Sequence, residues 1–212
     1  MNWQELSALL ALATAMTFTP GPNTTLSTAL AANHGLRRAL PFVCAVPVGW
    51  SALLLVCFLG LGALLLAFPV LQWTVKLLGV AYLLWLAWGL ARVKSIAAGS
   101  ARPQSNVRAL TLFWQGVALQ FVNIKAWMLA LALIGGWVTG RADAGQRLAV
   151  VVPVMLVYAF ASNLTYALVG SLLRTWLGGP DGSGHRLRWF NRAMALVLLA
   201  TAAWMLALPQ AT

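Results

Sequence analysis

Acidic residues are almost absent from this chain. Only three of its 212 residues are Asp or Glu, and charged residues of both signs make up 8% of the sequence. Soluble domains carry about 25% charged residues, so this composition excludes an ordinary soluble globular protein. Hydrophobic residues make up 61%, and the mean hydropathy is +0.84. The composition therefore predicts an all-α integral membrane protein, because an isolated apolar segment crosses a bilayer as a helix.

The side chains typical of catalytic sites are equally scarce, with two histidines and two cysteines. The apolar runs contain no paired carboxylates, no Cys/His metal spacing and no glycine loop that could cradle a phosphate. We therefore expect no enzyme, no metal and no cofactor. Cys44 and Cys57 fall in one predicted helix, about 19 Å apart along its axis and on roughly opposite faces. They cannot pair with each other there, which weakens the alternative hypothesis of a membrane thiol–disulfide electron carrier.

Long apolar runs fill most of the chain. Each reaches the roughly 20 residues that a spanning helix needs. The runs cover residues 6–33, 39–68, 69–91, 109–140, 148–173 and 190–209. The sequence thus predicts six transmembrane helices in a single domain, residues 1–212, with residues 92–108 as a polar linker. Because Glu5 and no basic residue precedes the first run, we expect a retained first helix rather than a cleaved signal peptide.

Basic residues gather on one side of the predicted helices. Ten of the 14 Lys and Arg residues follow the first, third and fifth runs, whereas the other loops hold only Arg141 and Arg147. The positive-inside rule then places the linker in the cytoplasm and both termini on the non-cytoplasmic side. This topology accounts for the net charge of +11, so we expect a lipid bilayer as partner and no nucleic acid. The sequence leaves a homo-oligomer open.

The six runs divide into two halves, residues 1–91 and 109–212. Three helices per half force the second half into the opposite orientation, which is the arrangement of an inverted-topology repeat. Polar interruptions fall at corresponding places, at residues 20–23 in the first run and 120–125 in the fourth. We therefore predict a 3+3 inverted repeat in which helices 1 and 4 are broken.

The first interruption, in TFTPGPNTTL (residues 17–26), breaks a helix in the middle of an apolar run. Two prolines leave carbonyl groups near Phe18 and Thr19 without helical partners, and the amides that follow start a new half-helix. Such backbone is tolerated in a membrane only when protein or a watery cavity surrounds it. The positive end of a half-helix suits a carboxylate, and the alternative is a structural bend shielded by its neighbours. The predicted substrate-binding residues of this segment are Pro20, Gly21, Pro22, Asn23, Thr24 and Thr25.

The second interruption adds Asn123 and Lys125 to the predicted site. A cation in the middle of an apolar run costs at least ~2.5 kcal/mol on insertion scales. The only acids, Glu5, Asp143 and Asp181, lie near helix ends or in loops, so a substrate carboxylate could be the partner of Lys125. Lys125 could instead carry the coupling proton, or bond to backbone carbonyls for packing alone.

Other polar residues in the runs permit two interpretations each. A polar patch in the fifth run could line a cavity or join helices through hydrogen bonds, and Asn163 and Tyr166 enter the predicted site from it. Its members are Ser162, Asn163, Thr165 and Tyr166. Asn33 and His34 precede Gly35 at the end of the first run, where we favour a helix cap with both side chains in water over a proton relay.

Lys76 and the tryptophans are expected to have structural roles. Lys76 lies within two turns of the start of its run, so we expect it to snorkel to the interface. Several tryptophans fall near predicted span ends, where an interfacial belt explains them, and others lie deeper, where packing explains them. The first group is Trp73, Trp137, Trp176 and Trp189, and the second is Trp50, Trp85, Trp88 and Trp127.

Three segments of this chain resemble landmarks of the LysE/RhtB family of amino-acid exporters: TPGPNTTLSTALAANHGLRRA, KLLGVAYLLWLAWGLAR and ALQFVNIKAWMLAL. The resemblance runs along almost the whole chain, and the last segment is similar to the subgroup that exports cysteine and O-acetylserine. Family members usually show Asn-Pro-Lys where this chain has Asn123-Ile124-Lys125, which leaves open how the fourth helix bends. The family landmarks fall on Pro20, Gly21, Pro22, Asn23, Asn123 and Lys125.

The resemblance implies a bacterial inner-membrane protein that exports small L-amino acids or relatives from the cytoplasm, driven by the proton gradient as an antiporter. Together with the residues above, it predicts a secondary transporter whose two broken helices meet near the membrane midplane. Between them they would hold a zwitterionic substrate.

Overall fold

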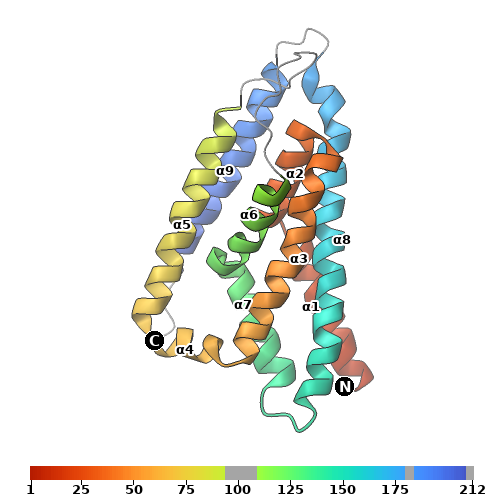
Figure 1. Ribbon diagram of the computed structural model, residues 1–212, viewed down its shortest axis with the longest axis vertical. Helices are drawn as coiled ribbons and strands as arrows, with labels where there is room; N and C mark the ends of the chain where they lie inside the picture. Colours follow the sequence, from red (N-terminus) through yellow and green to blue (C-terminus); the bar gives the residue numbers. More distant parts are fainter. Residues whose placement is uncertain (94–108, 180–183, 209–212) are drawn as a thin grey trace.

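Helices make up nearly all of the computed structural model, which describes residues 1–93, 109–179 and 184–208 (Figure 1). Most of the predicted linker, and Asp181, lie outside the described residues. The helices are α1 (Trp3–Phe18), α2 (Pro22–His34), α3 (Leu36–Phe58), α4 (Leu61–Ala67), α5 (Pro69–Ala91), α6 (Ala109–Val122), α7 (Ile124–Leu133), the π-helix η1 (Ile134–Val138), α8 (Ala144–Gly178) and α9 (His185–Ala207).

Four of these helices, α3, α5, α8 and α9, are long and apolar enough to cross a membrane. A fifth span results when α6 is joined to α7 and η1, which continue it after a bend of 65°. The expected all-α membrane protein is thus confirmed for the described residues. The remaining predicted span, the first run at residues 6–33, corresponds to α1 and α2, two short helices separated by the break at residues 19–21.

Helix α2 lies in the interior of the bundle, where it contacts α3, α8 and α9 (Figure 1). Ten of its 13 residues are buried, including Thr24, Thr25, Ser27 and Asn33. Other helices therefore surround α2, whereas each outer helix keeps a face that a bilayer would cover. That position explains how a half-helix with so many hydroxyl and amide groups can lie inside a membrane domain, because its neighbours can accept and donate hydrogen bonds.

Glycines let the inner helices approach one another closely. A methyl group added to Gly170 of α8 would lie 2.2 Å from the carbonyl oxygen of Thr28 on α2. On α3, the same addition to Gly49 would lie 2.7 Å from the Cα atom of Val117 on α6. Small residues at such positions are typical of membrane helix interfaces, where van der Waals contact between backbones drives association.

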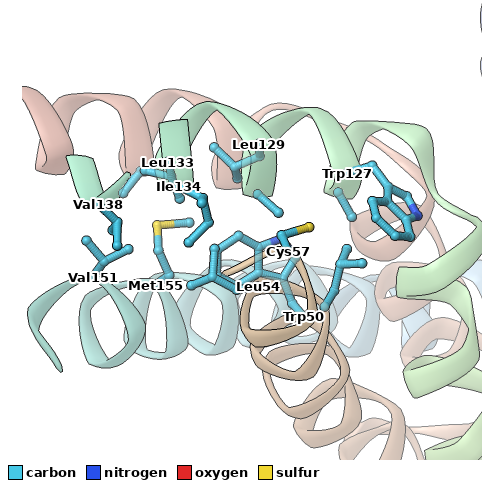
Figure 2. Packing of buried hydrophobic residues seen from close by; sticks show 14 of the residues in the cluster. Trp50, Leu54, Cys57, Trp127, Leu129, Leu133, Ile134, Val138, Val151 and Met155 are labelled. Carbon is cyan, nitrogen blue, oxygen red and sulfur yellow. The ribbon is translucent and has the colours of Figure 1, made fainter. Parts of the chain in front are cut away.

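An apolar cluster joins α3, α7, η1 and α8 beside the site (Figure 2). Trp50 and Leu54 of α3 contribute to it, together with Leu129 of α7 and Met155 of α8. Trp50 and Trp127 are buried as expected, but Trp85 and Trp88 are 60% and 61% exposed on α5. The expectation of packing is therefore wrong for that pair, because both side chains border a hollow between α5, α2 and α6.

Lys76 does not snorkel to the membrane surface. Its side chain is 2% exposed, and Nζ donates a hydrogen bond of 2.8 Å to the carbonyl oxygen of Leu208 at the end of α9. The ring of Trp73 lies 5.0 Å away. A cation is favourable at a helix C-terminus, where the last carbonyls lack partners and carry partial negative charge. The expectation was wrong because α9, far along the chain, supplies an acceptor inside the protein.

The end of α2 combines a confirmed cap with one correction. Gly35 has φ +84°, and its amide donates to the carbonyl of Ala31, as expected for a glycine cap. Asn33, however, does not reach water. It is buried and exchanges two hydrogen bonds, of 2.7 and 2.9 Å, with Asn191 of α9. A buried amide pair satisfies both side chains, so this end of α2 is fastened to α9.

Candidate functional site

The chain crosses the first break in an extended conformation. Thr19 (φ −69°, ψ 128°) ends α1, and α2 begins at Pro22, whose missing N–H costs nothing in the first helical turn. Gly21 between them is held by the Thr24 hydroxyl, which accepts from the Gly21 amide at 3.0 Å and donates to its carbonyl at 3.1 Å. The turn is therefore fixed by its own residues.

The carbonyl groups at the end of α1 have partners, but none of these partners lies in α1. Ser162 Oγ donates to Thr17 O at 2.6 Å, and Tyr166 OH donates to Phe18 O at 2.9 Å. Lys125 Nζ donates to Thr19 O at 2.9 Å. Helices α7 and α8 thus satisfy the three carbonyls that the break removes from helical pairing, as buried backbone groups require.

The second break lies at Asn123, between α6 and α7. Asn123 is extended (φ −91°, ψ 103°), and its side-chain oxygen accepts from the amide of Lys125 at 3.1 Å, so it caps α7. This cap accompanies the 65° bend even though Ile124 occupies the position where the resembled family has proline. The bend therefore does not need that proline, because an asparagine side chain replaces the lost helical hydrogen bond.

Two contacts join the breaks directly. Asn23 of α2 and Gln120 of α6 exchange hydrogen bonds of 2.9 and 3.0 Å between their side-chain amides. Lys125, just after the second break, bonds to Thr19 at the first. The expected meeting of the two interrupted segments is thus present in the structure, and neither segment can move without breaking polar contacts to the other.

A cavity of ≈ 60 Å³ lies between the two breaks. A single bound water needs roughly 10–15 Å³, so this space accommodates several water-sized groups and suits a small ligand. Its walls come from α1, α2, α3, α7, α8 and both breaks. The lining residues are Met16, Thr17, Thr19, Gly21, Pro22, Asn23, Thr24, Val46, Trp50, Asn123, Lys125, Ala126, Leu129, Met155, Ala159 and Asn163.

Most of the residues predicted for the site line this cavity: Gly21, Pro22, Asn23, Thr24, Asn123, Lys125 and Asn163. Three do not. Pro20 is exposed, Thr25 is buried behind the wall, and Tyr166 reaches the site only through its bond to Phe18. Asn163 also accepts a hydrogen bond from Ser27 Oγ at 2.9 Å, so this one member of the polar patch both lines the cavity and joins α8 to α2.

Sequence reasoning missed two residues that shape the site. Gln120 was noted as part of the second interruption but was not assigned to the site, although an amide inside an apolar run usually marks a buried polar contact. Trp50 was assigned to packing, and no signal in the sequence separates it from the other deep tryptophans.

Lys125 is half-buried, and within the described residues no acidic group forms an ion pair with it. The ion pairs lie elsewhere, at the end of the bundle where α1 and α8 begin. There Arg147 donates to both oxygens of Glu5 at 3.1 Å and to Asp143 at 2.7 Å. The hydrogen bond from Arg147 is the main reason that the pKa of Asp143 lies below its ordinary value of 3.8. The two acids expected near helix ends are thus engaged far from Lys125.

The described part of the chain has no group of three metal-ligating side chains. Cys44 is exposed, Cys57 is buried, and both are free thiols on α3. The polar groups of the cavity lining are therefore hydroxyl, amide, ammonium and backbone groups, which can form hydrogen bonds with a solute.

Membrane transporters are typically built around interrupted helices that enclose a cavity with polar groups inside an apolar bundle. The chain belongs to the LysE type translocator family, which matches residues 14–208. The resemblance drawn from the sequence is thereby confirmed, and a translocator is not an enzyme.

The relatives of this chain include cysteine/O-acetylserine efflux proteins. The cysteine/O-acetylserine efflux protein of Klebsiella pneumoniae is 30% identical over 195 residues, which cover 89% of this chain and 92% of that protein. The protein of the same name from Salmonella typhimurium is 27% identical over 92% of this chain and 93% of its own length. The one from Escherichia coli K12 is 29% identical over 77% and 80%. No solved structure matches this chain.

Proposed function

We propose that this protein exports small L-amino acids from the cytoplasm across the bacterial inner membrane, with cysteine and O-acetylserine as candidate substrates. The observation that carries the proposal is the cavity between the two breaks, in which Lys125 has no acidic partner among the described residues. The names of the similar efflux proteins support the choice of substrates. The volume of the cavity, ≈ 60 Å³, favours a small solute over a large one.

The two ends at the first break can recognise a zwitterion. The last carbonyls of α1 carry partial negative charge, and each retains a second lone pair that can accept from a substrate ammonium group. The first-turn amides of α2, at Asn23 and Thr24, have no acceptor within the helix and carry partial positive charge. A substrate carboxylate would lie near these amides and Lys125, whose ammonium group has three donors and uses one for Thr19.

The transport cycle would use the predicted inverted repeat. In this proposal α1 and α2 together form the first of six spans, and the halves at residues 1–91 and 109–212 rock against each other around the cavity. Each break belongs to one of the two halves that move. The contacts between the breaks, Asn23–Gln120 and Lys125–Thr19, would therefore break and re-form in each cycle.

The basic end of the bundle would face the cytoplasm. Three arginines there stack on tryptophan rings: Arg92 on Trp88 at 4.2 Å, Arg186 on Trp176 at 5.0 Å, and Arg192 on Trp189 at 5.4 Å. Paired cationic and aromatic side chains are typical of the membrane interface. The start of α1 and the end of α9 lie at the opposite end of the bundle (Figure 1), which supports the proposal that both termini are non-cytoplasmic.

Proton-driven antiport is the coupling that we propose. The described spans contain no Asp or Glu beside the cavity, so Lys125 is the one titratable side chain among the lining residues. It either balances the charge of the substrate carboxylate or exchanges a proton during the cycle. We favour the first role, because a substrate anion would neutralise a permanent cation that has no acidic partner.

Transport by purified protein in liposomes tests this function. Vesicles loaded in turn with cysteine, O-acetylserine, alanine or lysine would be diluted into a trace of the same labelled amino acid, with and without a pH gradient. We expect counterflow for the small amino acids, none for lysine, and stimulation by the gradient. Protein-free vesicles and the D-enantiomers are the controls. Absence of counterflow for every small amino acid would contradict the proposal.

A further inference from the structure

The hollow that lies between α5, α2 and α6, here named the α5 hollow, opens to the outside of the bundle. Its volume is ≈ 260 Å³, more than four times that of the cavity between the breaks. Trp85 and Trp88 of α5 border it and are still more than half exposed, and Figure 1 shows α5 at the edge of the bundle. An empty space would deprive its walls of van der Waals contacts, so in a bilayer a neighbouring molecule should fill the α5 hollow.

The walls of the α5 hollow are mainly apolar. Leu26 and Leu30 come from the interior helix α2, and Leu86 and Leu90 come from α5. A methyl group added to Gly89 of α5 would meet no atom within 4 Å, so free space remains beside this glycine. These walls offer van der Waals contact to a hydrocarbon chain and few hydrogen bonds to a polar solute.

A cation lies at the edge of the α5 hollow. The guanidinium group of Arg92 stacks on the ring of Trp88 at 4.2 Å, and both Trp88 and Val93 line the hollow. Stacking uses the face of the guanidinium plane, whereas its N–H donors lie in that plane and stay available. No carboxylate forms an ion pair with Arg92 within the described residues. The edge of the hollow is therefore suited to an anion.

The charge at this end of the bundle discriminates between two occupants. A second copy of the chain in the same orientation would bring another basic end to the same depth of the membrane, because ten of the 14 Lys and Arg residues lie on this side. Glu5 and Asp143, two of the three acids, lie at the opposite end and are bound to Arg147. A phospholipid with an anionic head group has the hydrocarbon chain for the walls and the phosphate for the cation.

We infer that the α5 hollow binds an anionic phospholipid. One acyl chain lies between the apolar walls of α2 and α5, and the phosphate accepts hydrogen bonds from Arg92. Arginine forms strong, often bidentate hydrogen bonds with phosphate, and basic sites between membrane helices are typical of anionic lipid binding. The inference goes beyond the transport of a solute. A lipid that joins α5 to the interior helix α2 should stabilise the protein whatever substrate it carries.

Lipid binding to the purified full-length protein tests this inference. The protein in detergent is titrated with phosphatidylglycerol and with phosphatidylcholine of the same chain lengths, and native mass spectrometry counts the bound lipids. We expect one phosphatidylglycerol to bind about tenfold more tightly than phosphatidylcholine and to raise the Tm. Glycerophosphoglycerol, which is the head group without acyl chains, should not bind measurably. If it binds as tightly as the whole lipid, the site takes a free anion and the inference is wrong.

Two substitutions separate the head group from the acyl chain. Arg92→Gln removes the cation and should weaken phosphatidylglycerol about tenfold, with phosphatidylcholine unchanged. Gly89→Trp places a large side chain in the free space of the hollow and should weaken both lipids. Unchanged lipid binding in both variants would overturn the inference.

Arg192 provides the matched control. It lies on α9 at the same basic end and stacks on Trp189 at 5.4 Å, but neither residue lines the α5 hollow. Arg192→Gln should therefore bind both lipids as the parent does. An equal loss in the Arg92 and Arg192 variants would mean that the whole basic surface attracts anionic lipid, which contradicts a specific site. A parent protein that binds no lipid but forms a dimer sensitive to Gly89→Trp would place a second copy in the hollow, which also contradicts it.

Discussion

The ammonium group of Lys125 lies 2.9 Å from the carbonyl oxygen of Thr19, although 106 residues separate the two in the chain. One residue belongs to the first turn of α7, after the second break, and the other ends α1 at the first break. The bond supplies a cationic partner to a carbonyl group at the end of α1. It also places the partial negative charge of that carbonyl beside the ammonium group. Any substrate carboxylate that approaches Lys125 therefore competes with, or adds to, a contact that holds the two breaks together.

Removal of both prolines at the first break should impair export. In a Pro20→Ala, Pro22→Ala double variant, α1 can continue into α2, so the amides of Asn23 and Thr24 become paired within the helix. Hydrogen bonds to a charged group are worth about 1.5–3 kcal/mol, so we expect export to fall by at least about tenfold at equal protein level. Pro153→Ala, within the continuous helix α8, is the control and should export normally. Normal export by the double variant would mean that the break is only a structural bend.

Close packing of α2 against α8 should make Gly170 sensitive to the smallest substitution. The methyl group of Gly170→Ala would lie 2.2 Å from Thr28 O, so the two helices must separate. Overpacking of this kind costs about 1–3 kcal/mol, which thermal unfolding in detergent would detect as a lower Tm. Gly89→Ala in α5 meets no atom within 4 Å and should keep or raise the Tm. Equal Tm values for the two variants would show that the α2–α8 contact is looser than described.

The hydrogen bond between Arg147 and Asp143 should stabilise the protein in a pH-dependent manner. It holds the folded-state pKa of Asp143 below the ordinary value of 3.8, so its contribution is fully present above that value. The contribution disappears as the pH falls through the lower, folded-state pKa. Arg147 lowers the pKa of Glu5 in the same way, so Arg147→Gln removes both contributions. The Tm difference between the parent and this variant should therefore be constant near neutral pH and shrink below about pH 4. Arg141→Gln, which removes a half-exposed side chain 3.8 Å from Glu5, should show a much smaller difference. A difference that is independent of pH would contradict this assignment.

The proposed orientation can be tested with a reporter enzyme that is active only in the cytoplasm. Fused after Ala98, between the third and fourth predicted spans, the reporter should be active. Fused to the C-terminus it should be silent. The reason is the distribution of basic residues, ten of which lie on the side of the first fusion. Activity at the C-terminal fusion alone would reverse the orientation, and activity at both would require an even number of spans between the fusion points instead of the three that are predicted.

Local chemistry made both breaks predictable from the sequence. Pro20 and Pro22 cannot occupy the interior of a helix, and Asn123 beside Lys125 is too polar for an uninterrupted apolar span. The run at residues 39–68 was predicted as one span, yet it contains a turn after Phe58, where Gly60 has φ +100°. Apolar residues on both sides hide this turn, because hydropathy records composition and not chain direction.

Contacts between distant segments were the part that the sequence could not supply. The partners of Lys76 and Lys125 are backbone carbonyls 132 and 106 residues away. Backbone groups are present at every position, so no pattern of residue types marks the ones that a cation will reach.

Substitution of Lys125 separates its two proposed roles. Lys125→Arg keeps the positive charge but hardly ever releases a proton, and Lys125→Gln keeps a donor without the charge. If Lys125 balances the substrate carboxylate, the Arg variant should retain part of the export, and the Gln variant should bind substrate at least about tenfold more weakly. The measurement is counterflow and pH-driven uptake in vesicles that contain equal amounts of protein. A methyl group added at Gly21 would lie 3.7 Å from Nζ, in ordinary contact, so some space is free there, but the planar guanidinium group does not reproduce the geometry of an ammonium group and full recovery is not expected.

If Lys125 instead carries the coupling proton, the two assays will diverge. The Arg variant should still exchange substrate for substrate across the membrane, because that exchange needs no net proton movement, but it should fail at uphill transport driven by a pH gradient. We expect the first outcome, since within the described residues Lys125 has only the carbonyl of Thr19 to offset its charge. A substrate carboxylate would complete that balance at each loading step. Parental rates of counterflow and of pH-driven uptake in both variants would exclude both roles, and the cavity between the breaks would then no longer be a candidate substrate site.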